Sequence, residues 1–508
     1  MFVYNTVWRD RRVLKEASSL AAHGWSVTVI GLSLASDRRP LHEVTADGVV
    51  IRRVPLSLAP PPWRRKRALI QLDHRLKVSS ARAMARWRER RARLRRRIAR
   101  LGERRALPRY IRRWPDGDAP RRLASRLNRR MEDFLRHTLG VARRAPAAAG
   151  EAGLLVWLAL YAGIDRLTRG EIDWLLNATD RWERFAREAA KLAPVADVYH
   201  GHDLSGIGAA VRVRDQHGRG SVVYDAHELY VEAGSLASRS GALKRVLRGR
   251  EAAAYRRADA VITVNEGLAG ELESRYGAHH IALVHNCVSV HDSDGRDRLR
   301  EALGLPRTAR IALYQGALTE VRGLRQLLAA FQLPTMAADH LAFMGFGPML
   351  DEVRGWAAAF PRVHVLPAVP PDELEAWVST ADVSLMVNQP AGRNELLSTP
   401  NKLFESLAAG VPVITSDFPE RRAIVLDPVL GPLGKVCDPT DPASIASAVR
   451  SVLEATRAES DAMRERCRRA AAGRWSWANQ EATLLSVYDA ITRGPTPIQA
   501  TEGRRTAA

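Results

Sequence analysis

The residues with the clearest chemical potential lie between positions 394 and 415, in the sequence NELLSTPNKLFESLAAGVPVIT. Pro400 suits the first turn of a helix, where its missing N–H costs nothing, and Ser398 or Thr399 can cap that helix. A buried strand is expected directly after the helix. The free N–H groups at 398–401 would then form an anion site that suits a pyrophosphate.

Two charged side chains add to this site. Glu405 lies one to two turns inside the helix, where its carboxylate could accept hydrogen bonds from a ribose diol. Arg322 opens the helix after a strand that ends at Gly316, and its guanidinium could grip phosphate oxygens bidentately. Both residues also suit a solvated helix surface, and this simpler interpretation stays open for each of them.

A glycine turn follows a third strand, in the sequence MGFGPM at 344–349. Gly345 and Gly347 would let the backbone approach a ligand closely, although a single G-x-G is a weak signal. All three turns are expected at strand-to-helix connections of one sheet, which is where open α/β sheets bind their ligands. Their common location strengthens all three assignments.

The first half of the chain places histidines at strand ends. DVYHGHD carries His200 and His202, and YDAHELY carries His227 and Glu228. Such side chains can donate to a substrate hydroxyl or transfer protons, but packed or capping histidines are the more common case. Metal binding is a further option. The spacing matches no zinc pattern, so no metal site is predicted.

The elements that must position these residues alternate regularly between short apolar runs and amphipathic stretches. The expected strands lie at 25–31, 47–54, 197–200, 221–224 and 259–264, and then at IALYQ, LAFMG, VHVLP, DVSLMV and VPVIT. Such alternation predicts parallel sheets covered by helices on both faces. Two separate series predict two doubly wound domains of the α/β class, with a boundary near 288–306.

The charge of the chain is concentrated in one segment. Residues 61–150 hold 29 Lys and Arg against 7 Asp and Glu, and this excess equals the formal net charge of +22 of all 508 residues. The rest of the chain is therefore neutral, so the overall charge is no argument for nucleic-acid binding. An apolar patch at 153–164 follows, too short to span a bilayer.

The motifs, taken in order, resemble a known family. DRRVLKEASSLAAHGWSVTVIG, DVYHGHDLSGIGAA, VVYDAHELY, ADAVITVNEGLA, ALYQGALTEVRGL and above all STPNKLFESLAAGVPVITSD resemble retaining glycosyltransferases of family 4. The resemblance covers roughly 1–55 and 190–492. It implies the GT-B architecture, in which two Rossmann-like domains face each other across a cleft that binds a nucleotide-diphosphate sugar.

This resemblance implies a domain plan. An acceptor-side domain would span 1–290 and contain an Arg-rich helical insertion at about 57–190. A nucleotide-sugar domain would span 291–473, and a terminal helix at 474–492 would cross back to the first domain. Residues 493–508 are expected to form a disordered tail.

The resemblance also implies roles for individual residues. Glu405 would bind the donor ribose and Arg322 the diphosphate, residues 397–401 would bind sugar and phosphate through backbone amides, and no divalent metal or other cofactor would be needed. The implied donor-binding residues are Gly316, Arg322, Gly345, Gly347, Leu397, Ser398, Thr399, Asn401 and Glu405. The implied catalytic residues are His202, facing the transferred sugar, with His227 and Glu228 near the donor or acceptor.

Two departures from the family pattern concern the donor site. Many members carry a glutamate eight positions before the one matching Glu405, and here that position is Leu397; Glu395 is a candidate replacement. Many members have an arginine directly after the glycine matching Gly316, and here it is Ala317. Diphosphate binding would then depend more on Arg322.

The basic segment at 61–150 predicts a binding surface of its own. Arginine clusters, interfacial tryptophans and the patch at 153–164 predict docking on an anionic membrane, which would suit a lipid-linked acceptor or another saccharide acceptor in cell-surface polysaccharide or glycolipid synthesis. One alternative for the segment is a solvated helical hairpin. The alternatives for the protein are a soluble glycosyltransferase that acts on a small acceptor and uses the insertion for protein contacts, or an inactive scaffold that recruits partners through it; nucleic acid is not an expected partner. Three scattered cysteines and an N-terminus interrupted by Arg9, Arg11 and Arg12 predict a cytoplasmic protein, peripheral to the inner face of the plasma membrane.

Overall fold

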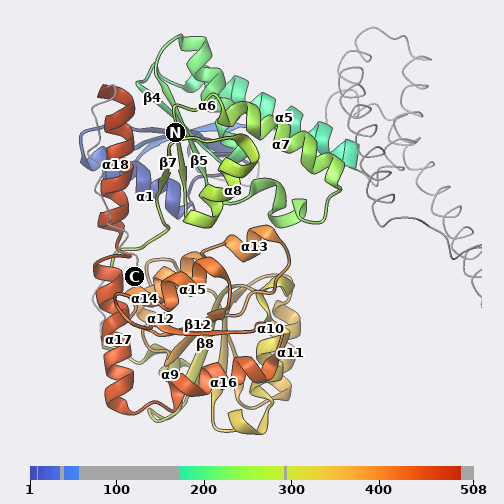
Figure 1. The fold of residues 1–508 in the computed structure, drawn as a ribbon, viewed down its shortest axis with the longest axis vertical. Helices are drawn as coiled ribbons and strands as arrows, with labels where there is room; N and C mark the ends of the chain where they lie inside the picture. The colour runs from blue at the N-terminus through green and yellow to red at the C-terminus, as the bar shows by residue number, and fades with distance from the viewer. Residues whose placement is uncertain (9, 35–38, 57–170, 291–294, 494–508) are drawn as a thin grey trace, which may run out of the picture.

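The computed structural model describes residues 1–8, 10–34, 39–56, 171–290 and 295–493. Most of the predicted insertion, its apolar patch at 153–164 and the predicted tail at 494–508 lie outside the described residues. Within the described part of the chain, two α/β domains are stacked on each other (Figure 1). No helix among these residues is both long enough and apolar enough to cross a bilayer.

The first domain contains one twisted sheet made of two ladders. Its strands are β1 (Thr28–Ser33), β2 (His42–Val44), β3 (Val50–Pro55), β4 (Val198–His202), β5 (Ser221–Ala226), β6 (Ala260–Thr263) and β7 (Ile281–Leu283). The ladders run in the orders β1-β3-β2 and β4-β5-β6-β7, and all neighbours except β2 and β3 are parallel. Phe2 joins the ladders, because it pairs with both Ile30 and Gly201.

Helices cover both faces of this sheet. They are α1 (Arg11–Ala22), α5 (Glu171–Leu192), α6 (Asp203–His217), α7 (Gly241–Tyr255), α8 (Glu266–Tyr276) and the terminal α18 (Trp477–Arg493). Phe185 of α5 and Ile207 of α6 pack with Tyr224 in one buried cluster. Val13 of α1 and Leu484 of α18 pack with Val223 in another. Thus the last part of the predicted insertion, 171–190, is helical as expected and belongs to the core of the first domain.

The second domain has a six-stranded parallel sheet. Its strands are β8 (Ile311–Ala317), β9 (His340–Phe346), β10 (Val363–Leu366), β11 (Val383–Met386), β12 (Val413–Ser416) and β13 (Gly434–Cys437). Its helices are α9 (Arg298–Leu303), α10 (Leu324–Phe331), α11 (Leu350–Ala359), α12 (Leu374–Val378), α13 (Arg393–Leu397), α14 (Asn401–Ala408), α15 (Pro419–Val425), α16 (Pro442–Leu453) and α17 (Arg457–Ala472). Buried clusters on both sides of the sheet give the doubly wound arrangement predicted from the sequence.

The strand order of the second sheet determines where a ligand fits. The order is β10-β9-β8-β11-β12-β13, so the chain extends the sheet in one direction from β8 and then in the other from β11. The connections that follow β8 and β11 therefore leave towards opposite faces. In open α/β sheets, the crevice at such a switch point, outside the carboxyl ends of the strands, is the ligand site.

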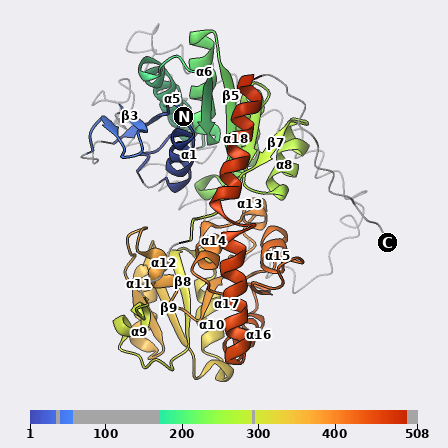
Figure 2. The ribbon, with the colours of Figure 1, turned by 90° about the vertical axis from the view of Figure 1, so that its left-hand side faces the viewer.

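The last two helices lie along one side of both domains. Figures 1 and 2 show α17 beside the second domain and α18 beside the first, one after the other. Trp477 at the start of α18 donates from Nε1 to Oγ of Ser19 on α1, at 2.8 Å. The end of the chain therefore contacts the first helix of the first domain.

Replacing Leu484 with alanine should therefore destabilise the first domain. Leu484 is fully buried between α18, α1 and the sheet, and truncation of such a leucine typically costs about 2–5 kcal/mol of unfolding free energy. Urea unfolding followed by circular dichroism measures the change. Ser486→Ala, an exposed position on the same helix, is the control and should change stability by less than about 0.5 kcal/mol. Equal midpoints for L484A and the unmodified chain would contradict the assigned packing.

Candidate functional site

A pocket of about 460 Å³ lies at the switch point of the second sheet. Its walls come from the ends of β8 and β9, from the turn before α10, from α13 and from the first turns of α14. Glu228 closes it from the first domain. Gly316, Arg322, Gly345, Ser398, Asn401 and Glu405, all predicted from the sequence as donor-binding residues, line this one pocket.

Glu405 connects the pocket to the other domain. Its Oε1 accepts a hydrogen bond from Nη1 of Arg11 on α1 at 2.9 Å, and its Oε2 accepts one from Nε2 of Gln315 at 3.3 Å. Its side chain is 14% exposed. Burial raises the pKa of Glu405, while Arg11 and Lys402 oppose that shift. The residue is thus a constrained carboxylate between the two domains rather than a solvated one.

Arg11 belongs to a second pocket, of about 500 Å³, that shares Glu405 and Asn401 with the first. Its Nη2 also donates to the carbonyl oxygen of Pro371 in the second domain. Lys15, one turn further along α1, lines the same pocket. The cleft therefore continues from the switch point to α1, and Glu405 lies where its two parts meet.

The start of α14 differs from the prediction in one respect. Pro400 is the residue before the helix, in extended conformation, and neither Ser398 nor Thr399 caps the helix with its side chain. The hydroxyl of Ser398 instead donates to the carbonyl oxygen of Glu395, because Ser398 ends the preceding short helix α13. The backbone around 398–401 still enters the pocket from this turn, through Ser398, Pro400 and Asn401.

Arg322 faces a carboxylate across the pocket. Its Nη1 lies 3.8 Å from Oε2 of Glu395, which also accepts from Nδ2 of Asn388 at 2.9 Å. Arg421, whose side chain is buried, approaches the same Glu395 oxygen at 3.8 Å and donates to Ser398. Glu395, the residue proposed to replace the missing glutamate at Leu397, therefore does reach the pocket, between two guanidinium groups.

Lys402 is a pocket residue that the sequence reasoning missed. It lies three positions before Glu405 on α14, a spacing that places both on one helix face and could have revealed it. Its Nζ is buried without a hydrogen-bond partner, 4.1 Å above the ring of Tyr314. Burial holds the pKa of Lys402 well below its usual range, and the charge of Arg322 adds to this effect.

The glycines of the site serve backbone packing. A Cβ on Gly345 would lie 1.9 Å from the carbonyl oxygen of Gly316, and one on Gly347 would lie 2.4 Å from that of Leu318. β9 and the turn after it therefore approach β8 too closely for any side chain. Gly345 lines the pocket, whereas Gly347 is not among its lining residues.

Leu397 and Thr399 contact the first domain instead of the pocket. Leu397 packs with Leu229, Val264 and Leu268 in a buried apolar cluster. Asn265 of the first domain donates from Nδ2 to the carbonyl oxygen of Leu397 at 2.7 Å, and the same amide lies 3.3 Å from Oγ1 of Thr399. The position where many family members carry a glutamate is thus part of the domain interface.

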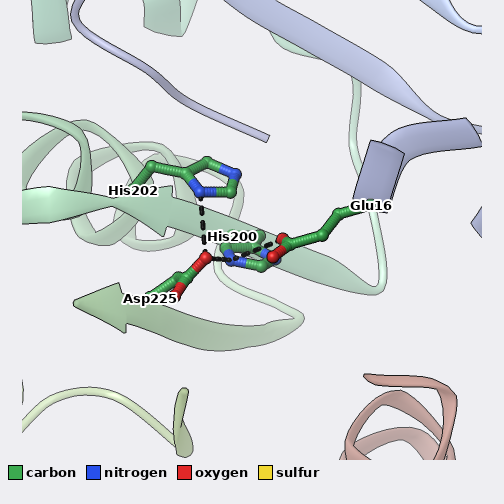
Figure 3. A group of neighbouring side chains, drawn as sticks. All are labelled: Glu16, His200, His202 and Asp225. Carbon is green, nitrogen blue, oxygen red and sulfur yellow. Dashed lines mark ion pairs between the residues drawn. The ribbon is translucent and has the colours of Figure 1, made fainter. Parts of the chain in front are cut away.

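His200 and His202 lie in a buried network of the first domain (Figure 3), and His227 adjoins it, with Nε2 3.2 Å from Nδ1 of His202. One ligand-type atom each from Glu16, His200, His202 and Asp225 lies within 4.8 Å of the others. These are residue types that bind zinc or manganese. Both oxygens of Asp225, however, already accept hydrogen bonds from Arg12, at 2.9 Å each. The positive charge of Arg12 beside Asp225 opposes a bound cation, so the network is better explained as Asp225 paired with Arg12 and His227, with His200 and His202 packed beside it.

The histidines differ in their charge. Burial lowers the pKa of His200 to about 3 and that of His202 to about 4, so both are neutral near pH 7. Burial also opposes charge on His227, but the carboxylates of Asp225 and Asp203 outweigh it and raise the pKa of His227 to about 10. His202 is 1% exposed and lines neither pocket.

Glu228 is the predicted catalytic residue that reaches the pocket. Burial raises its pKa to about 7, and the negative charge of Asp203 adds to the effect. The next residue, Leu229, donates its backbone N–H to Oδ1 of Asn394 in the second domain, at 2.8 Å. This contact holds the residues that follow β5, Glu228 among them, against the second domain.

Comparisons with known proteins agree with this architecture. A family model described as Glycosyltransferase Family 4 matches residues 121–292, and one described as Glycosyl transferases group 1 matches residues 309–455. A glycogen synthase of Mycobacterium tuberculosis is 29% identical over 275 residues, which make up 50% of this chain and 60% of the relative. The matched part is thus less than two thirds of that relative's length.

The fold as a whole is similar to that of sucrose-phosphate synthase from Thermosynechococcus elongatus. The TM-score is 0.55 at 15% sequence identity, and the alignment covers 94% of this chain and 92% of that one. At this identity the likeness concerns the fold alone. The predicted GT-B arrangement of two Rossmann-like domains is confirmed.

The raised pKa of His227 predicts a pH-dependent contribution to stability. Its folded pKa of about 10 exceeds the ordinary value of 6.5, so the contribution is complete below about pH 6.5 and is lost as the pH rises through 10. His227→Gln should therefore lower the unfolding free energy by about 1.5–3 kcal/mol at pH 6, and by much less near pH 10. Urea unfolding across this range measures it. His280→Gln, at an exposed histidine, should show no such trend, and a loss for H227Q that does not change with pH would contradict the assigned charge.

Proposed function

We propose that this chain, which carries a family 4 glycosyltransferase domain followed by a group 1 glycosyl transferase domain, transfers a sugar from a nucleotide-diphosphate sugar to an acceptor with retention of configuration. The observation that carries this proposal is the convergence of Arg322, Glu405 and the turn before α14 on one pocket at the switch point of the second sheet.

Donor binding would use the charges of this pocket. The ribose diol would donate to Glu405, whose oxygens now accept from Arg11 and Gln315. Arg322 would pair with the diphosphate, supported by backbone N–H groups at the start of α14. The side-chain cations and the helix terminus supply the positive potential, so we propose that no divalent metal or other cofactor takes part.

The chemical step would occur where the two domains meet. The acceptor would bind to the first domain, and domain closure would exclude water and align its oxygen with the anomeric carbon. In a front-face reaction the leaving diphosphate takes the acceptor proton, and Arg322 stabilises the charge that develops on it. Glu228, with a pKa of about 7, lies at the pocket wall and could exchange a proton with a bound hydroxyl.

His227 and His202 would act from positions further from the pocket than Glu228. His227 is cationic and accessible enough to meet a substrate oxygen, since its side chain is 17% exposed. His202, whose Nδ1 lies 3.2 Å from Nε2 of His227, would reach the transferred sugar only through a rearrangement of this contact. A role for His202 in orienting His227 fits the described geometry without such a change.

The acceptor and the location of the protein are inferred from the sequence of the basic segment at 61–150. Its arginines and the apolar patch at 153–164 would dock on an anionic membrane, which would bring a lipid-linked or saccharide acceptor in cell-surface polysaccharide or glycolipid synthesis to the cleft. The protein would then be cytoplasmic and peripheral to the inner face of the plasma membrane.

An inactive scaffold is the second candidate. It is favoured by Leu397, which stands where many family members carry a glutamate and which here packs against the first domain. Hydrolysis or transfer of any nucleotide sugar by the purified protein separates the two candidates, because a scaffold would do neither.

Glu405→Gln tests the donor site. The change keeps the shape but removes a charge-assisted hydrogen bond, so nucleotide affinity should fall by about 1.5–3 kcal/mol. A thermal-shift panel of nucleotides and nucleotide sugars identifies the ligand, and calorimetry then measures its affinity. Glu454→Gln, at a carboxylate directly after α16 that pairs with Arg450, is the matched control and should bind normally.

Arg11→Gln separates the loss of the carboxylate from the loss of its ion pair. This variant breaks the Arg11–Glu405 contact but keeps Glu405 available, so it should retain nucleotide binding. Normal affinity in E405Q, or an equal loss in R11Q and E405Q, would rule out the proposed role of Glu405.

Liposome flotation tests the membrane proposal. The full-length protein should float with vesicles that contain anionic lipid and stay at the bottom with neutral ones, and added salt should weaken the binding. A variant in which the arginines of 86–100 are replaced by glutamine should lose flotation while it keeps nucleotide binding. If the unmodified protein floats with neither the anionic nor the neutral vesicles, the membrane proposal is wrong.

A further inference from the structure

Lys402 lines the donor pocket. Among the residues that the structure describes, it is the one basic side chain of this pocket that makes neither an ion pair nor a hydrogen bond. Its Nζ is buried and makes no hydrogen bond. Arg322 and Arg421, by contrast, both lie 3.8 Å from Glu395. Glu405, the nearest carboxylate on the same helix, accepts its bonds from Arg11 and Gln315.

The position of Nζ is set by aromatic and backbone neighbours. It lies 4.1 Å above the ring of Tyr314, and a Cβ on Gly316 would be 3.5 Å from it. Because Gly316 has no side chain and Ala317 has only a methyl group, the space in front of the amine belongs to the pocket, which both residues line. Lys402 lines this pocket, but Nζ itself is covered, so a ligand would contact the amine after a small movement of the lysine side chain.

The charged groups that face Lys402 belong to the helices and turns that surround it. Arg322 comes from the turn before α10, Glu395 from α13, Arg421 from α15, and Glu405 from α14 itself. The Tyr314 hydroxyl, on β8, donates to the carbonyl oxygen of Ala317 and does not reach Nζ by a hydrogen bond. Arg11 further offsets the charge of Glu405.

Without a bound anion, the surroundings of Lys402 disfavour a proton on its amine. Burial lowers the pKa of the amine well below its usual range, Arg322 and Arg421 lower it further, and Glu405 and Glu395 only partly compensate. Removing an ammonium group from water without a hydrogen bond is costly, and the contact with the Tyr314 ring offsets only part of this cost. An anion placed against Nζ would reverse this preference.

We propose that Lys402 takes up one proton from solvent when the diphosphate of the donor binds, and that the ammonium group so formed holds the diphosphate beside Gly316. The step is a protonation alone: the amine lone pair of Lys402 accepts the proton, and no other bond changes. This inference rests on the proposed function, because it assigns a recognition residue and a proton linkage to the same donor site.

Calorimetry tests the proton uptake. UDP, ADP, GDP and dTDP are the probes, and the tightest binder is titrated at pH 8, where its phosphates are fully ionised. The binding enthalpy should differ between Tris and HEPES buffers, whose ionisation enthalpies are unequal, and the difference should correspond to uptake by the protein. Affinity should also fall between pH 8 and pH 9.5, because protons become scarcer.

Two substitutions distinguish recognition from a structural role. Lys402→Arg carries a permanent charge, so it should retain binding with an enthalpy that no longer depends on the buffer. Lys402→Met should bind at least about tenfold more weakly, since it loses a charge-assisted contact, while its melting temperature without ligand should not fall. Lys435→Met, at a lysine on β13, is the matched control and should behave as the unmodified chain.

The outcomes separate the two proposals. Nucleoside diphosphate binding with equal enthalpies in both buffers, or undiminished affinity in K402M, overturns the role of Lys402 and leaves the donor site of the proposed function intact. Absence of binding for all four nucleoside diphosphates overturns the proposed function, and the role of Lys402 with it.

Discussion

The contact between Arg11 and Glu405 is the interaction on which the rest of the site depends. It joins the first helix of one domain to the first turns of α14 in the other, across 394 positions of sequence. A buried carboxylate needs donors to stay charged, and Arg11 and Gln315 supply them. Any ligand hydroxyl that binds Glu405 must share or replace these donors. Ligand binding in the second domain and the position of the first domain are therefore linked through one side chain.

In the first domain, three histidines lie near Asp225, and they differ in charge. Its carboxylate is held charged chiefly by Arg12 and His227, although burial opposes this, and its pKa lies well below the usual range. The same carboxylate raises the pKa of His227, while burial keeps His200 and His202 neutral. Groups whose environments shift their pKa values apart in this way can divide acid and base roles between them. Arg12, which pairs with Asp225, lines the second pocket of the cleft, and Glu228, the neighbour of His227 in the chain, lines the first.

The sequence predicted the features that local patterns determine. Apolar runs located ten strands, and the parallel order of those in the second domain places their carboxyl ends at one edge, which is why Gly316, Arg322 and Glu405 meet in one pocket. β2 and β7 were not predicted because each has only three residues, and β13 was not predicted because a lysine interrupts its four residues. Lys402 could have been found from its spacing to Glu405. The partners of Arg11 and of Leu397 could not, because they depend on how the two domains pack.

The charges of the donor pocket also bear on what it can bind. Arg322 and Arg421 share one carboxylate, Glu395, while Glu405 is neutralised from across the cleft by Arg11. Such a surplus of positive charge is unfavourable in a buried place and becomes favourable when an anion enters. A divalent cation would increase the surplus instead of relieving it. The charges of this pocket therefore suit an anionic ligand better than a divalent cation.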